Sequence, residues 1–219
     1  MSETTGISWT DHTFNPVHGC AKVSPACDHC YAERDSKRFA GGQVLWGVDA
    51  ARRTFGDKHW NEPLRWNAKA AKEGVRRRVF CASMADVFDK NWPDGTRDRL
   101  WRLIEATPHL DWLLLTKRIG NARAMLPDAW LEAEWPGNAR LGITVINQEE
   151  VDRDVVKLLA LNCPNFLSIE PMLGFVDLTA VRIGDATLDA LGGVLVEDAT
   201  MKRWQEFRRG IDWVIAGGE

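Results

Sequence analysis

The sequence lacks an apolar run long enough to cross a bilayer, and Met1 to Thr10 lack the basic and apolar regions of a signal peptide. It also has no surplus of positive charge, because 28 basic residues face 31 acidic ones and the net charge is -3. No global field therefore attracts nucleic acid, and a nucleic-acid partner is possible but not indicated. We expect a cytoplasmic protein with no membrane-spanning segment.

Cysteine is scarce and unevenly placed, since the chain has 5 cysteines, an odd number. Cys20, Cys27 and Cys30 lie close together, whereas Cys81 and Cys163 stand alone. In a reducing cytoplasm, clustered cysteines indicate metal or redox chemistry rather than a disulfide framework. We expect the two isolated cysteines to be small buried hydrophobic residues.

Short apolar runs recur along the chain, and they are apolar throughout rather than alternating. This pattern is typical of parallel strands that are covered on both faces. The expected strands are 11–17, 78–83, 112–116, 140–146, 165–169 and 212–216. Helical patterns separate them at 31–39, 63–74, 96–106, 148–161 and 200–209. Segment 178–196 is expected to be an irregular insert with a small hairpin at Gly192-Gly193.

This alternation predicts an α/β fold, a partial parallel (β/α)6-type barrel resembling a TIM barrel. The length of 219 residues suits a single domain spanning 1–219. The last expected strand is followed only by a Gly-Gly turn and Glu219, with no helix to cover it. We therefore expect the natural domain to continue beyond this chain.

The three clustered cysteines have the spacing C-x6-C-x2-C, just after the first expected strand and before the first expected helix. Barrel enzymes carry their chemistry on such loops. Thiolates favour iron–sulfur clusters, zinc or copper(I), and a cluster with three cysteines keeps one iron open to a small molecule. The alternative is a structural Cys3His zinc site with His12, His18 or His29. The chain has no second C-x2-C pair, and an α/β core needs no metal, which favours iron and sulfur.

The wider pattern resembles the radical S-adenosylmethionine superfamily, although the commonest spacing there is C-x3-C-x2-C. The stretches that carry the resemblance are 15–20, 24–27 and 30–32, followed by Ser83-Met-Ala-Asp86, Leu115-Thr-Lys-Arg118, Gly142-Ile-Thr-Val, Ser168-Ile-Glu-Pro171 and Ile215-Ala-Gly-Gly-Glu219. They occur in order at successive strand ends and are similar to an uncharacterised, phage-associated three-cysteine branch. The resemblance implies a [4Fe–4S] cluster on Cys20, Cys27 and Cys30.

It also implies S-adenosylmethionine as the second cofactor, cleaved to a 5′-deoxyadenosyl radical that takes hydrogen from an unknown substrate. An electron donor such as flavodoxin or ferredoxin would be required. The implied cofactor contacts are Ser83 and Asp86 for the amino group and Thr144 and Asn147 for the ribose. Lys117, with Arg118, would meet the cofactor carboxylate or an anionic substrate, and Glu170 would face the same end of the barrel. The usual Gly-Gly-Glu is absent after the second expected strand, and Ile146 stands where the branch has a glutamate.

Ordinary structural roles are open for several of these residues. Asp86 can cap a turn before Asn91, Glu170 can pair with a basic residue, and Lys117 and Arg118 can be a solvated strand end. The basic stretches 52–53 and 76–78 are expected to be solvated charge. Two other functions also stay open: a zinc-stabilised binding module, and a shortened chain that binds a cluster without turnover.

Overall fold

The computed structural model describes residues 5–28, 30–39, 41–197, 204–206 and 209–217. The chain divides into two compact units, Met1–Leu115 with Pro127–Arg140, and Thr116–Leu126 with Leu141–Glu219. The expectation of a single domain stays a prediction. In the part of the chain that is described, no helix is both long and apolar enough to span a membrane.

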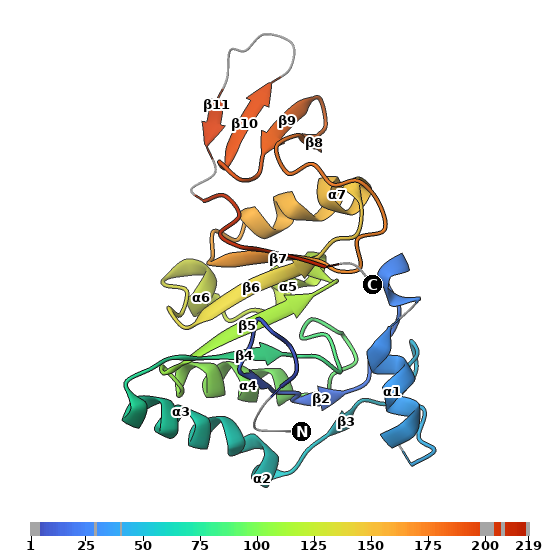
Figure 1. Cartoon of the computed structure of the whole chain (residues 1–219), viewed down its shortest axis with the longest axis vertical. Helices are drawn as coiled ribbons and strands as arrows, with labels where there is room; N and C mark the ends of the chain where they lie inside the picture. Colours follow the sequence, from blue (N-terminus) through green and yellow to red (C-terminus); the bar gives the residue numbers. More distant parts are fainter. Residues whose placement is uncertain (1–4, 29, 40, 198–203, 207–208, 218–219) are drawn as a thin grey trace. The chain divides into compact units, whose positions relative to one another are not determined.

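The main sheet has six strands in the order β1-β4-β5-β6-β7-β12. Four of its strands, β4, β5, β6 and β7, are labelled in Figure 1. Apart from segments outside this sheet, the spatial order follows the chain order, as in barrels built from successive βα units. Five of the six expected strand segments correspond to one strand each, and the first, 11–17, contains β1 and the start of a second strand. The expected α/β fold with a parallel sheet is confirmed.

In the first unit, β1 (His12–Thr13) pairs in parallel with β4 (Arg77–Cys81), and β4 pairs in parallel with β5 (Leu110–Thr116). Trp112 in β5 is fully buried and meets Phe14 edge to face, with 5.7 Å between ring centroids. Helices α3 (Glu62–Glu73) and α4 (Thr96–Glu105) follow the expected helical segments, and α3 ends at Gly74, whose φ is 68°. Glycine adopts this left-handed end without the steric penalty of a side chain.

The first unit also contains the shorter elements that frame the cysteines. Strand β2 (Val17–His18) pairs antiparallel with β3 (Arg53–Thr54). Between these two strands lie the 3-10 helix η1 (Pro25–Cys27) and α1 (Tyr31–Phe39), and α1 has the bounds that the sequence predicts. Two further short helices, α2 (Asp57–Trp60) and α6 (Asp128–Glu132), were not expected from the sequence.

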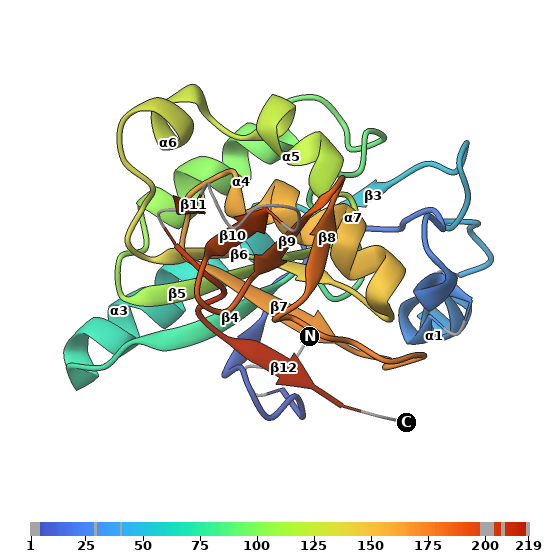
Figure 2. The same cartoon turned by 90° about the horizontal axis from the view of Figure 1, so that it is seen from above.

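In the second unit, β6 (Ala139–Thr144) pairs in parallel with β7 (Asn165–Ile169), and β12 (Val214–Ala216) runs alongside β7 (Figure 2). Gly142 allows the Phe166 ring to lie directly on β6, because an added Cβ would be 2.3 Å from a ring carbon. The helices are α5 (Ile119–Met125) and α7 (Gln148–Leu159), and α7 begins with acidic residues as expected.

The insert in the second unit forms a four-stranded antiparallel sheet in the order β11-β10-β9-β8. Its strands are β8 (Val181–Ile183), β9 (Ala186–Asp189), β10 (Val194–Glu197) and β11 (Trp204–Glu206). The hairpin at Gly192-Gly193 is confirmed between β9 and β10. The helix expected over 200–209 is wrong where the chain is described, because 204–206 form β11 and Trp204 lies opposite Val196. The helix was predicted from the helical spacing of two aromatic residues. Residues 204–206 form a strand instead, because their backbone groups hydrogen-bond to the open edge of β10, and a local spacing does not indicate such pairing.

Candidate functional site

The cysteine loop begins where β2 ends and finishes at the start of α1. Ser24 caps η1 by accepting a hydrogen bond from the Ala26 amide, with Pro25 at the first helical position. The Cys27 carbonyl accepts from the Cys30 amide at 3.3 Å, and the Cys30 carbonyl accepts from the Arg34 amide at 3.2 Å. Cys27 therefore ends one helical turn and Cys30 immediately precedes α1. All three thiols are half-buried, and none forms a disulfide.

Both ends of this loop are attached to the segment that follows β4. The Gly19 amide donates to the Met84 carbonyl at 2.9 Å, and the Tyr31 hydroxyl donates to the Ser83 carbonyl at 3.2 Å. The buried Asn15 adds a second link, because its Nδ2 donates to Ser83 Oγ at 3.0 Å and its Oδ1 accepts from the Met84 amide at 2.8 Å. The cysteines and the Ser83–Asp86 segment thus belong to one local assembly.

Asp86 lies in the turn after β4 and is buried, with 6% of its surface exposed. Its Oδ1 accepts from the Phe88 amide at 3.0 Å, and its carbonyl accepts from the Asp89 amide at 3.0 Å. The side chain therefore stabilises this turn, as the structural alternative for Asp86 predicts. A role in cofactor binding stays a prediction for both Asp86 and Ser83.

A buried arginine also belongs to this assembly, and the sequence did not reveal it. The Arg52 side chain is 0% exposed, and its Nε donates to Asp89 Oδ2 at 2.8 Å. The expectation of solvated charge is thus wrong for Arg52, whereas the neighbouring Arg53 is exposed as predicted. Its partner Asp89 is distant in the sequence, so no local sequence pattern indicates this ion pair.

In the second unit, two predicted residues meet directly. Lys117 follows β5, and its Nζ donates to Thr144 Oγ1 at 3.3 Å, where the buried Thr144 ends β6. Lys117 and Arg118 are both half-buried rather than fully solvated. Asn147 caps α7, because its Oδ1 accepts from the Glu150 amide at 3.0 Å. Its side-chain amide nitrogen has no hydrogen-bond partner among the described residues.

Glu170 follows β7 and is half-buried. Its carboxylate lies over Gly217, where an added Cβ would be 2.2 Å from Oε1. In the described part of the chain the carboxylate has neither an ion pair nor a hydrogen bond. The alternative in which Glu170 pairs with a basic residue is therefore not observed there. A half-buried carboxylate at a strand end is a suitable acceptor for a polar ligand.

The histidines of the zinc alternative have different surroundings. His12 stacks on Trp66 at 4.4 Å between centroids, and His29 lies outside the described residues. His18 Nε2 is buried and has no hydrogen-bond partner in the described structure. Burial, with Arg53 nearby, lowers the pKa of His18 and favours the neutral ring.

The donor set itself fits an iron–sulfur cluster, because three free, half-buried thiols lie on one loop. Among the described residues, no three His, Cys, Asp or Glu side chains are close enough to share one metal ion. A [4Fe–4S] cluster binds each thiolate to a different iron, so its ligands need not converge on a single point. Cys81 and Cys163 are confirmed as buried, and burial raises the pKa of the Cys163 thiol to about 12.

Comparison with solved structures shows a similar fold in spore photoproduct lyase complexed with dinucleoside spore photoproduct. The TM-score is 0.51 at 14% identity, covering 75% of this chain and 46% of the lyase chain. A substituted variant of that lyase gives a TM-score of 0.50 at the same identity and coverage. At this identity the similarity concerns the fold alone, and this chain matches less than half of the lyase.

A search of curated proteins finds no match to the sequence. A family model does match, over residues 4–219, and its description is a protein of unknown function, DUF5131. The match covers nearly the whole chain, including the cysteine loop and every predicted site residue. The chain therefore belongs to the DUF5131 family.

Proposed function

We propose that the chain binds a [4Fe–4S] cluster through Cys20, Cys27 and Cys30, and S-adenosylmethionine at the iron that has no protein ligand. The observation that carries this proposal is that three half-buried cysteines, none in a disulfide, lie on one loop whose two ends are hydrogen-bonded to the segment that follows β4. The fold of spore photoproduct lyase, a radical S-adenosylmethionine enzyme, supports the same superfamily.

The residues around the loop suit an anionic cluster. Cys30 immediately precedes α1, and the positive end of a helix dipole favours negative charge at that position. The loop follows β2 rather than lying within a strand, so its thiols can turn toward a bound group. When bound, the two cofactors supply one-electron cleavage of a carbon–sulfur bond and hydrogen abstraction from a substrate.

Roles for the other residues follow from the chemistry of their polar groups. The Asp86 carboxylate and the Ser83 hydroxyl are groups that can accept hydrogen bonds from the ammonium of the cofactor. The amide nitrogen of Asn147 and the Thr144 hydroxyl suit ribose hydroxyls. The Lys117 ammonium suits the cofactor carboxylate, and the carboxylate of Glu170 can accept a further hydrogen bond.

An electron donor such as flavodoxin or ferredoxin would reduce the cluster. The substrate stays unassigned, because this chain matches less than half of the lyase and the ligand of that enzyme cannot be transferred.

The test is anaerobic reconstitution with iron and sulfide, followed by electron paramagnetic resonance of the reduced protein with and without S-adenosylmethionine. We expect a reduced [4Fe–4S] signal that changes when the cofactor is added and that is lost in Cys27→Ala. Cys163→Ala is the matched control, because Cys163 is a free but buried cysteine outside the loop, and this variant should keep the signal.

The zinc-stabilised module is the competing function, and the buried, unpartnered His18 Nε2 next to the loop favours it. It predicts one tightly held zinc, no visible absorbance and no cofactor cleavage. Stoichiometric zinc without a cluster, together with loss of that zinc in His18→Gln, would replace the radical-enzyme proposal.

A further inference from the structure

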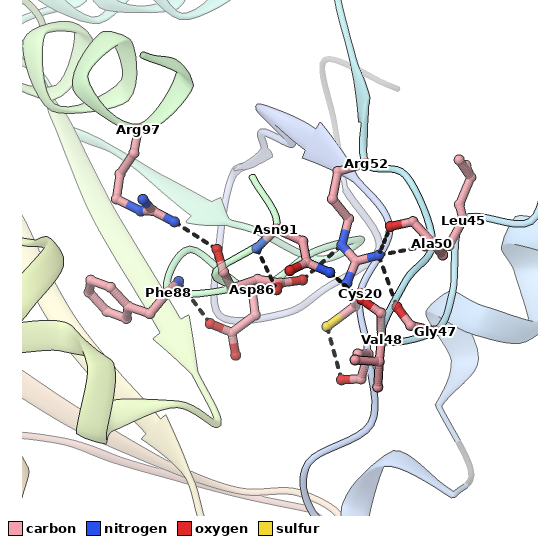
Figure 3. A network of polar contacts seen from close by, with 12 residues as sticks. Cys20, Leu45, Gly47, Val48, Ala50, Arg52, Asp86, Phe88, Asn91 and Arg97 are labelled. Carbon is pink, nitrogen blue, oxygen red and sulfur yellow. Dashed lines mark hydrogen bonds and ion pairs between the residues drawn. The ribbon is translucent and has the colours of Figure 1, made fainter. Parts of the chain in front are cut away.

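Arg52 is a buried charge beside the cysteine loop whose hydrogen bonds are incomplete. An arginine has five N–H donors, and a buried guanidinium needs acceptors for them. Its Nε donates to Asp89, and its Nη1 donates to the carbonyls of Ala50 at 2.6 Å, Gly47 at 3.2 Å and Leu45 at 3.5 Å. These three carbonyls belong to the turn at residues 45–50, and Figure 3 shows the Arg52 guanidinium reaching this turn beside Cys20. Its Nη2 is buried and has no partner within the described structure.

The turn that Arg52 holds is bonded directly to Cys20. The Gly47 amide donates to the Cys20 carbonyl at 3.0 Å, and Cys20 forms a parallel bridge with Trp46. The stem of Arg52 also packs against the residue before Cys20, because a Cβ at Gly19 would lie 3.1 Å from Arg52 Cδ. One side chain thus fixes the turn and borders the backbone that carries the first cysteine.

Asp89 places the guanidinium in this position. Its Oδ2 accepts from Arg52, and its Oδ1 accepts from the Asn91 amide at 3.1 Å. Asn91 in turn donates through Nδ2 to the Val48 carbonyl, within the same turn. The loop after β4 is therefore hydrogen-bonded to the turn before β3 through Asp89 and Asn91, and together they fix the position of Arg52 beside Cys20.

We propose that Arg52 is a positioning residue for Cys20, and that its Nη2 would donate a hydrogen bond to the Cys20 thiolate when that thiolate holds a cluster. This inference rests on the proposed function. The Cys20 thiolate would supply the acceptor that the buried Nη2 lacks. A donor beside cluster sulfur stabilises the reduced, more negative cluster, so Arg52 raises the reduction potential.

Arg97 provides a matched control for the experiment. Its Nε donates to the Val87 carbonyl at 2.9 Å and its Nη2 to the Asp89 carbonyl at 2.7 Å, so it stabilises the same loop after β4. None of these bonds reaches the turn at 45–50. Arg52→Lys and Arg97→Lys should both lower the unfolding midpoint, and only Arg52→Lys should affect Cys20.

The first measurement needs no cluster. Alkylation of the metal-free protein, followed by mass spectrometry, gives separate rates for Cys20 and Cys27. In Arg52→Lys we expect Cys20 to react about tenfold faster relative to Cys27, which corresponds to about 1.4 kcal/mol on opening of the turn. The second measurement is the reduction potential of the reconstituted protein, which should become more negative in Arg52→Lys and stay unchanged in Arg97→Lys.

The outcomes separate the two proposals. A wild-type protein that loads a cluster, with an Arg52→Lys variant unchanged in both Cys20 reactivity and potential, overturns the inference alone. Equal changes in Arg52→Lys and Arg97→Lys would show that Arg52 contributes only to the stability of the fold, and this result also overturns the inference. A wild-type protein that loads no cluster overturns the proposed function and, with it, the bond from Nη2 to sulfur.

Discussion

Replacing Gly19 with alanine tests whether the cysteine loop depends on a close approach between two backbone segments. Gly19 has a φ of 121°, and an added Cβ would lie 2.4 Å from the Leu45 carbonyl oxygen. The left-handed conformation costs a non-glycine residue about 1–3 kcal/mol, and overpacking against a neighbour adds about 1–3 kcal/mol. The clash is with backbone rather than with a flexible side chain, so the loop or the turn must move. We expect Gly19→Ala to lower the free energy of unfolding by about 2–6 kcal/mol.

Gly74→Ala is the control for this prediction. Gly74 also has a positive φ, 68°, but a Cβ there meets nothing within 4 Å. It should therefore cost about 1 kcal/mol, the conformational part alone. Urea unfolding followed by tryptophan fluorescence measures both variants, and iron content after reconstitution reports the loop. Equal destabilisation by the two variants, with full iron loading in Gly19→Ala, would refute the close-approach argument.

Three further predictions concern the surroundings of the loop and of Glu170. Asn15→Ala should destabilise the fold by about 2–3 kcal/mol in urea unfolding, because the buried Asn15 loses two hydrogen bonds to the Ser83-Met84 segment; a change below about 0.5 kcal/mol would contradict this. Burial lowers the pKa of His59, outweighing the Asn15 carbonyl and Glu62, so the unfolded chain binds the extra proton first. Stability should fall as pH drops through about 6.5, and His59→Gln should flatten that slope in urea unfolding at several pH values. Gly217→Ala should displace Glu170 and weaken S-adenosylmethionine binding about tenfold in calorimetry of the reconstituted protein, as should Glu170→Gln; wild-type affinity in both variants would remove Glu170 from the site.

The sequence predicts elements best where burial alone decides them. The strand at Asn165–Ile169 and the helix at Tyr31–Phe39 have the expected bounds, because a short, largely apolar run and a helical pattern are local features. The expected helix over 200–209 failed because β11 forms by pairing with a strand that is contributed by another part of the insert. Short helices such as α5 and α6 lack the length over which periodicity becomes visible.

The candidate site shows the same division between local and distant information. The position of the three cysteines between a strand and a helix follows from spacing alone. Asn15 and Arg52 were not recognised, because their partners at Ser83, Met84 and Asp89 are brought near only by the fold. A buried arginine and a solvated arginine look alike in a sequence, since only a distant carboxylate distinguishes them.

The attachment of Gly19 to Met84 and of Tyr31 to Ser83 has a consequence for how a metal group would be acquired. Two adjacent residues, Ser83 and Met84, hold both ends of the loop, so the entropy of closing the loop is already lost when the protein folds. Binding of a metal group then needs to order only the thiol side chains. The loss of backbone entropy therefore opposes binding less than it would for an unattached loop. The metal-free protein should keep its loop conformation. A cluster would then bind to a loop that is already folded, rather than induce folding of the loop around the metal.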